Sequence, residues 1–267
     1  VYKKDRGYAF EQQLNDNTNN VLDKRIYEYY APEFKSEIPM LIINPTIVNN
    51  GKRLIISPQP TSYLSYIAPQ ENIKNNFLLE SIEFKRFFKD QDAKNLKFTS
   101  ALRMNSTFPY IMPIVSLPSN PAMEVMDAGI RDNFGTKNSM KFLYTFRNWI
   151  EKNTSGVIFI QIRDAEKKNR IETNKNKTFI NNMTYPVSNV YKNLFITQDY
   201  DHDQLFQYTS EWFGNKVDAI DLVLDNNKKN RLSLSWHLTE SEKKRVYNSI
   251  NRPDNQESIR RLKQLLD

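Results

Sequence analysis

The 267-residue sequence contains no cysteine, so it can form neither disulfide bonds nor thiolate metal sites. It has no run of 18 apolar residues, and residues 1–6 lack the apolar centre and the cleavage site of a signal peptide. These absences predict a soluble chain without a membrane span. They leave the compartment unknown, and a cytoplasmic, membrane-associated location is compatible with them.

Glycine is scarce, and its spacing excludes several motifs. The six glycines stand at positions 7, 51, 129, 135, 156 and 214. No two of them are two, four or five residues apart, so G-x-G-x-x-G, G-x-S-x-G and G-x-x-x-x-G-K are all impossible. The sequence therefore contains no dinucleotide fingerprint, no P-loop and no nucleophile elbow. We expect no bound cofactor.

Composition and charge indicate a folded chain with several candidate partners. Hydrophobic residues make up 39% of the sequence, enough for a core, although the mean hydropathy is only −0.68. Asn- and Lys-rich stretches at 15–20 and 166–182 lower it, and we expect both to be loops. The net charge of +7 suits an acidic membrane surface or nucleic acid. Basic residues occur in short pairs mixed with acids, so nucleic acid is not an expected partner.

Short apolar runs alternate with helical patterns along the chain. The run at 39–48, bounded by prolines and by Asn49-Asn50-Gly51, predicts a buried strand that ends in a turn. Further strands are expected at 53–57, 124–129, 156–162 and 193–197. Helices are expected at 71–89, 98–107, 136–152, 205–213, 240–251 and 257–266.

The strand at 124–129, the following helix and the strand at 156–162 have the order of a βαβ unit. The strand at 156–162 is continuous and β-branched, as a buried strand of a parallel sheet would be. The pattern therefore predicts one α/β domain over residues 1–267 with a mainly parallel sheet.

Asp127 stands at the end of a predicted strand and two residues before Gly129. In doubly wound folds, catalytic groups lie at the carboxyl ends of the strands, and glycine permits a sharp turn there. An aspartate in this place can equally cap the turn or the next helix, and the residues alone favour that structural role. The neighbouring Arg131 and Asp132 are expected to pair with each other or to cap the next helix.

The ordered segments at 38–51, 98–113 and 124–135 resemble the patatin family of lipid acyl hydrolases. Residues 98–113, FTSALRMNSTFPYIMP, are similar to the helix and proline-closed loop that precede the family's catalytic aspartate. Residues 124–135, EVMDAGIRDNFG, resemble its strand and Asp-Gly element, here as Asp-x-Gly. Residues 38–46 with Gly51 are similar to the strand after the nucleophile helix, with its Asn-x-Thr. The resemblance covers about 38–164 and is closest to bacterial patatin-like phospholipases.

This resemblance implies an α/β/α sandwich and a Ser/Asp dyad, in which Asp127 is the catalytic residue and Gly129 supports its motif. Family members carry a glycine-rich oxyanion loop and a G-x-S-x-G elbow before these segments, and this sequence contains neither. The chain is therefore expected to be the later portion of a patatin-like domain, with 165–267 as a helical C-terminal extension. The expected partners are the missing N-terminal half of the same polypeptide and a lipid or phospholipid ester.

Other residues suggest sites without a motif behind them. His202 lies among Asp199, Asp201 and Asp203, a group that could bind a metal ion but that more often caps a helix. His237 is expected to be packed or at a helix start. We therefore expect no metal site.

The aromatic residues Tyr27, Tyr29 and Tyr30 are expected in the core, with a membrane-facing rim as the alternative.

Two functions follow from these observations. The first is a portion of a lipid acyl hydrolase of phospholipase A or esterase type, inactive without the serine segment. The alternative is a non-catalytic module of the same fold that binds acidic membrane surfaces.

Overall fold

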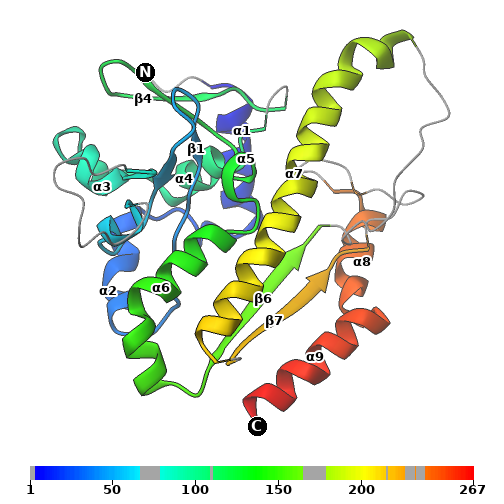
Figure 1. The fold of residues 1–267 in the computed structure, drawn as a ribbon. Coiled ribbons are helices and arrows are strands. Elements are labelled where there is room, and N and C mark those ends of the chain that lie inside the picture. The colour runs from blue at the N-terminus through cyan, green and yellow to red at the C-terminus, as the bar shows by residue number, and fades with distance from the viewer. Residues whose placement is uncertain are drawn as a thin grey trace. The chain divides into compact units, whose positions relative to one another are not determined.

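The computed structural model describes residues 4–66, 79–108, 111–164, 179–214, 216–225, 232 and 238–267, with the backbone alone for 179–192. It is a mixed α/β protein (Figure 1). The chain divides into two compact units, Val1–Gly135 and Thr136–Asp267. The expectation that all 267 residues form one domain stays a prediction.

Unit 1 combines short helices with short strands. Its α-helices are α1 (Arg6–Asn17), α2 (Tyr30–Phe34), α3 (Phe84–Phe87), α4 (Phe98–Asn105) and α5 (Gly129–Asp132). Its strands are β1 (Thr46–Ile47), β2 (Arg53–Ile55), β3 (Ser81–Glu83), β4 (Val115–Leu117) and β5 (Met123–Met126). Its 3-10 turns are η1 (Ile26–Tyr29), η2 (Ser62–Leu64), η3 (Lys89–Gln91) and η4 (Ala93–Asn95).

The five strands of unit 1 form one mixed sheet in the order β3-β2-β1-β5-β4. Only β2 and β3 are parallel, whereas the other three neighbouring pairs are antiparallel. The expectation of a mainly parallel sheet is therefore wrong for this unit. Strand β5, which leads to Asp127, is an inner strand with β1 on one side and the edge strand β4 on the other.

The apolar run at 39–48 contributes less strand than its composition predicts. Only Thr46–Ile47 forms a strand, and Ile43 adds an isolated bridge to Ile56. Pro45 lies between these two pairings and has no N–H to continue a ladder. The run is nevertheless buried, because Ile43 and Ile47 belong to the hydrophobic cluster of unit 1 together with Leu54 and Val125.

The prediction of a helix at 71–89 is wrong for residues 79–89, which are the part of this range that the structure describes. Strand β3 takes Ser81–Glu83, and only one helical turn follows at Phe84–Phe87. Parallel pairing of β3 with Arg53–Ile55 places Ile82 beside Leu54. Pairing with a distant strand thus overrides the local helical pattern.

Helix α4 is fixed against α1 by a buried arginine. The guanidinium of Arg103 forms ion pairs with Asp5 at 3.1 Å and with Glu11 at 3.5 Å. It lies directly against Gly7, where an added Cβ would stand 2.0 Å from the Arg103 Nε. A side chain at this position would therefore have to displace the Arg103 guanidinium from its two carboxylates.

Unit 2 contains a parallel pair of seven-residue strands, β6 (Val157–Arg163) and β7 (Val217–Val223), in register from Val157 with Val217 to Arg163 with Val223. Its helices are α6 (Thr136–Asn153), α7 (Phe179–Trp212), α8 (Glu240–Asn248), the 3-10 turn η5 (Ser249–Asn251) and α9 (Pro253–Leu266). One hydrophobic cluster joins Leu143 and Ile150 of α6 with Phe213 and Val217. Helix α9 lies along β7 (Figure 1).

The βαβ unit expected from β5, α6 and β6 does not form. Strands β5 and β6 belong to different sheets. Both sides of β5 are already occupied by β1 and β4, so no edge is left for β6. Strand β7, for which no expectation was made, supplies the parallel neighbour instead.

Two further expectations for unit 2 are wrong. The strand expected at 193–197 is part of α7, where the Thr197 hydroxyl donates to the Asn193 carbonyl one helical turn earlier. The strand at 156–162 is confirmed as β6, but it is not buried: Ile160 is 52% exposed and Ile162 is 72% exposed. The helices expected at 98–107, 136–152, 240–251 and 257–266 are confirmed to within a few residues. Residues 205–212 are helical as expected, but they are the end of α7, which begins at Phe179.

Replacing Gly7 with alanine tests the packing of α1 on α4. Inside a helix, Gly→Ala is ordinarily stabilising. Here we expect the opposite, a loss of about 2 kcal/mol in the free energy of unfolding, because the methyl group meets a guanidinium held by two carboxylates. Urea unfolding measures the change. Ala9→Ser, at an exposed position of the same helix, is the control, and a stabilised Gly7→Ala variant would contradict this packing.

Candidate functional site

Three chain segments far apart in the sequence meet at Asp127, and each belongs to one of the three stretches singled out above. The Asp127 N–H donates to the Thr107 carbonyl at 2.9 Å, and the Ala128 N–H donates to the Asn105 carbonyl at 3.1 Å. The Thr46 hydroxyl donates to the main-chain carbonyl of Asp127 at 2.9 Å. The Asn44 N–H donates to the Asn105 side-chain carbonyl at 3.1 Å. The end of β5 is thereby tied both to the end of α4 and to β1.

The Asp127 carboxylate is half-buried and has one fixed oxygen. Its Oδ1 accepts a hydrogen bond from the Gly129 N–H at 2.6 Å, so the side chain holds the turn that opens α5. Among the described residues, Oδ2 has no hydrogen-bond donor. Burial raises the pKa of Asp127 above its ordinary value of 3.8, and the Gly129 N–H opposes this rise by stabilising the charged form.

Gly129 has a role other than the one expected from glycine. The described glycines with a positive φ are Gly51, Gly135 and Gly214, so Gly129 is not held in the left-handed region. It is buried at the first position of α5 and supplies the N–H that fixes the Asp127 carboxylate. The hydrogen bond by which Asp127 caps the turn is therefore the same one that holds its carboxylate in the candidate site.

A buried ion pair holds α5 against the sheet. Arg53 of β2 is almost fully buried, and its guanidinium lies 2.6 Å from the Glu80 carboxylate and 3.6 Å from that of Asp132. The sequence expectation for Asp132 did not include Arg53 as a partner. Such a pair supports the turn after Asp127, because removing one member leaves an uncompensated buried charge.

Asn44 also lies at the candidate site. The sequence pointed to it only as part of the segment 38–46, not as a residue with a role of its own. Its side chain is buried, and its Nδ2 donates no hydrogen bond within the part of the chain that the structure describes. A buried amide without an acceptor is costly and therefore uncommon. The resemblance pointed to Asn-x-Thr at this place, but composition and spacing carry no signal for the free amide.

Nucleophile and base are not paired among the described residues. The hydroxyls of Thr46 and Thr107 belong to the hydrogen-bond network around Asp127, but neither bonds to its carboxylate. The Thr46 hydroxyl donates to the main-chain carbonyl of Asp127, and the Thr107 hydroxyl donates to the Arg103 carbonyl. The arrangement offers a desolvated base with one free oxygen, which suits proton transfer.

No family model matches the chain, and no curated protein is similar to it. The resemblance to patatins therefore depends on the three segments and on their meeting at Asp127.

The other candidate residues lie away from this site. Asp199 and His202 are inside α7, which begins at Phe179, so the expectation that these residues cap a helix is wrong. Asp199 binds Arg163 of β6 through both carboxylate oxygens at 2.8 Å, and His202 is buried. His237 lies outside the described residues. Over those residues, no group of three or more acidic or histidine side chains could hold a metal ion.

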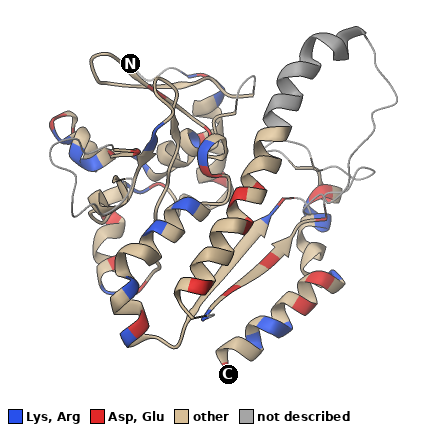
Figure 2. Ribbon diagram, viewed as in Figure 1, with Lys and Arg blue, Asp and Glu red and all other residues tan. Residues whose placement is uncertain are grey.

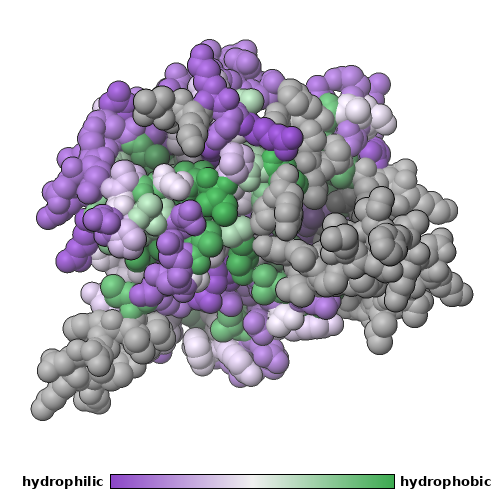
Figure 3. Space-filling model, turned by 90° about the horizontal axis from the view of Figure 1, so that it is seen from above, coloured by the Kyte–Doolittle hydropathy of each residue, from purple (hydrophilic) through white to green (hydrophobic). Residues whose placement is uncertain are grey.

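The aromatic residues near the start of the chain divide between core and surface. Tyr29 contacts Phe98 with ring centroids 5.1 Å apart, as expected for packing. Tyr27 and Tyr30 are 47% and 41% exposed, and Phe34, stacked on Tyr30, is 75% exposed. The core expectation is wrong for Tyr27 and Tyr30. Apolar residues also lie among polar ones on the face shown in Figure 3.

A cavity of about 580 Å³ lies elsewhere in unit 1, between β3, η2 and α3. Its walls include Ser62, Ser81, Arg86 and Phe87 and none of the residues that surround Asp127. No helix among the described residues is long and apolar enough to cross a bilayer.

The pKa of Asp127 has a consequence for stability. The folded state binds the Asp127 proton more tightly than the unfolded chain, so ionising this group destabilises the fold as pH rises from 3.8 through the folded pKa. An asparagine side chain in its place would keep an oxygen for the Gly129 N–H without the charge. We therefore expect Asp127→Asn to melt at a higher temperature than the unsubstituted protein at pH 7, with an advantage that shrinks as pH falls towards 3.8. A lower melting temperature at pH 7 would show that burial does not penalise this carboxylate.

Proposed function

We propose that this chain supplies the aspartate half of a Ser/Asp lipid acyl hydrolase with a patatin-like fold. The observation that carries the proposal is the meeting of residues 44–46, 105–107 and 127–129 in one hydrogen-bonded site. The three patatin-like segments lie far apart in the sequence, and a patatin-like site requires them to meet around the aspartate.

The proposed reaction uses Asp127 as the only general acid and base. A serine Oγ attacks the ester carbonyl while its proton moves to the free Oδ2 of Asp127. The tetrahedral intermediate collapses, and the leaving alcohol takes that proton. Water then attacks the acyl-serine, gives its proton to Asp127 and releases the fatty acid as the serine is re-protonated. No histidine is needed in this sequence of steps.

The geometry suits this role for two reasons. An aspartate with an ordinary pKa is a weak base, and burial raises the pKa of Asp127 towards a more effective value. The Gly129 N–H holds Oδ1, which leaves Oδ2 in a defined direction for proton transfer.

In this proposal the nucleophile comes from a segment outside this sequence. The glycine spacing excludes G-x-S-x-G, and no described hydroxyl contacts the Asp127 carboxylate. The backbone N–H groups that stabilise the oxyanion would come from the same absent segment. A lipid or phospholipid ester is the proposed substrate, and a polypeptide segment with the serine is the proposed partner.

Substitution of Asp127 tests the assignment in the polypeptide that carries both segments. Asp127→Asn keeps the acceptor for Gly129 and removes the base, so kcat/KM for p-nitrophenyl butyrate should fall by about 10³-fold. Asp90→Asn, at an exposed acid of unit 1, is the matched control and should retain full activity. Unchanged turnover by Asp127→Asn would remove this residue from the mechanism.

Thr46 is proposed as a positioning residue, because its buried hydroxyl holds the Asp127 main chain and not the carboxylate. Thr46→Val removes a hydrogen bond worth about 1 kcal/mol and should lower kcat several-fold with little change in KM. Thr46→Ser keeps the hydroxyl and should restore kcat. Equal kcat values for the valine and serine variants would contradict the positioning role.

The exposed aromatic residues favour the second candidate, a non-catalytic module at acidic membrane surfaces. Tyr30 and Phe34 present stacked rings at the surface, as interfacial aromatic residues do. Charges of both signs are interspersed along the helices that Figure 2 colours, and acidic lipids attract such a mixture less than a cluster of basic residues. The two candidate functions predict different results for a polypeptide that also contains the serine segment. The hydrolase turns over esters, whereas the membrane-binding module does not.

A further inference from the structure

The cavity between β3, η2 and α3 has an apolar wall that is open to solvent. Its volume of about 580 Å³ lies within the range of pockets that hold small organic molecules, about 300–1,000 Å³. The apolar side chains that line it are those of Tyr66, Leu79, Ile82 and Phe87. Phe87 is 49% exposed, and Leu79 is 39% exposed. Covering such a concave apolar surface with an apolar molecule is favourable, because it removes both from water.

Contacts inside unit 1 hold this wall in place. The Phe87 ring meets the buried Phe88 ring edge-on, with ring centroids 4.9 Å apart. The hydroxyl of Ser81 in β3 donates to the Leu64 carbonyl in η2 at 2.8 Å, which joins two sides of the cavity. The cavity is therefore formed before a ligand enters, and binding requires little ordering of the protein.

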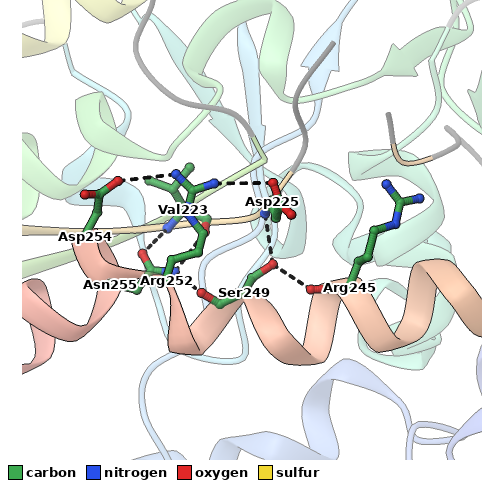
Figure 4. A network of polar contacts seen from close by, with 7 residues as sticks. All are labelled: Val223, Asp225, Arg245, Ser249, Arg252, Asp254 and Asn255. Carbon is green, nitrogen blue, oxygen red and sulfur yellow. Dashed lines mark hydrogen bonds and ion pairs between the residues drawn. The ribbon is translucent and has the colours of Figure 1, made fainter. Parts of the chain in front are cut away.

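Ser65 brings a buried hydroxyl without a partner to the cavity. The residue is 7% exposed, and its main-chain carbonyl accepts from the Glu80 N–H at 3.0 Å. Its hydroxyl forms no hydrogen bond to any residue that the structure describes. Ser249 of η5 shows the ordinary case, because its hydroxyl accepts from the Asp225 N–H and donates to the Arg245 carbonyl (Figure 4). The Ser65 hydroxyl is thus available to a ligand.

The charges of the cavity wall favour an anion. The charged residues that line it, within the described part of the chain, are Lys52, Glu83 and Arg86. The Glu83 carboxylate already accepts a hydrogen bond from the Ser62 hydroxyl. Neither Lys52 nor Arg86 forms a side-chain hydrogen bond or an ion pair with a described residue. Two unpaired cations against one carboxylate attract a negative group more than a positive one.

Lys52 and Ser65 lie at the end of the cavity that is remote from Glu83. The Arg53 N–H donates to the Glu80 carbonyl at 3.3 Å, and the Glu80 N–H donates to the Ser65 carbonyl. The half-buried Lys52 therefore lies on one side of the start of β3 and Ser65 on the other. The Glu80 carboxylate is bound by Arg53 at 2.6 Å. An ammonium and a hydroxyl thus meet at this end, whereas Arg86 shares its end with Glu83.

We propose that this cavity binds a small organic monoanion with an apolar chain or ring. Its anionic oxygens lie at Lys52 and Ser65, which supply the charged and the neutral donor, and its apolar body runs along Ile82 to Phe87. A carboxylate of about eight carbons suits the volume. The cavity shares no residue with the surroundings of Asp127, so this inference does not rest on the proposed function.

Calorimetric titration of the 267-residue chain with three eight-carbon compounds tests the preference. Octanoate should bind at least about tenfold more tightly than the neutral 1-octanol, and octyltrimethylammonium should bind no more tightly than 1-octanol. Equal affinities for octanoate and 1-octanol would overturn the anion preference. A chain that binds no octanoate at millimolar concentration would overturn the cavity as a binding site.

Substitutions of the two donors test where the carboxylate lies. Lys52→Gln should lower the affinity for octanoate by about tenfold and leave that for 1-octanol unchanged, and Ser65→Ala should act in the same direction. Lys89→Gln removes the same charge at an exposed position outside the cavity and is the control. Equal losses in Lys52→Gln and Lys89→Gln would reduce the effect to general attraction by a basic chain. A loss in Arg86→Gln but not in Lys52→Gln would contradict the proposed position of the carboxylate.

Truncation of the apolar wall gives the complementary result. Phe87→Ala should weaken octanoate and 1-octanol by similar factors, because both place their chains against this ring. In nitrogen-15 NMR spectra, octanoate should shift the amide signals of Ser65, Ile82 and Phe87, and the same spectra show whether each variant is folded. Octanoate shifts confined to residues outside the cavity wall would overturn the proposal.

Discussion

The candidate site depends on two main-chain hydrogen bonds, from Asp127 and Ala128 to the carbonyls at the end of α4. They join the carboxyl end of an inner strand to the carboxyl end of a helix, two places where the chain would otherwise leave polar groups unpaired. The bonds from Thr46 and Asn44 add β1 to the same junction. Asp127 is therefore held by its main chain, which leaves one carboxylate oxygen free for chemistry.

Charged groups in the interior of unit 1 support this junction from two sides. Arg103 fixes α4 against α1 through Asp5 and Glu11, and Gly7 leaves the space for its guanidinium. Arg53 fixes the turn after Asp127 through Asp132. Buried pairs of this kind add little net stability, but breaking one is costly, so they restrict the structure to one arrangement.

The sheets of the two units differ in how complete they are. In unit 1, the mixed sheet ends in a covered strand on one side and a short strand on the other. In unit 2, side chains of α9 satisfy outward backbone groups of Asp221 and Val223 at the carboxyl end of β7, and β7 is the strand that pairs with β6 among the described residues.

The sequence predicts local features well and distant pairings poorly. The helices at 98–107 and 136–152 follow from their periodicity, and the strand and turn at 124–129 follow from a short apolar run before Asp-x-Gly. Sheet neighbours are not encoded locally. The βαβ expectation is therefore wrong, because nothing near β5 shows that β1 and β4 occupy both its sides.

In the candidate site, too, the local features can be predicted from the sequence and the contacts between distant residues cannot. Asp127 and Gly129 can be predicted because their motif is contiguous. The pairing of Asp132 with Arg53 and the buried amide of Asn44 arise only when residues far apart in the sequence meet. The short apolar run at 193–197 is ambiguous between strand and helix, and the length of α7 decides it.

Asp127 is proposed as a desolvated base with one free oxygen. Carbon-13 NMR titration of the aspartate side-chain carboxyls tests it most directly, with the Asp127 signal assigned from its absence in the Asp127→Asn spectrum. We expect Asp127 to titrate clearly above 3.8, the ordinary value of its pKa. Titration at or below 3.8 would mean that the carboxylate is stabilised as an ion in the folded protein, and it would contradict the assignment of Asp127 as the base.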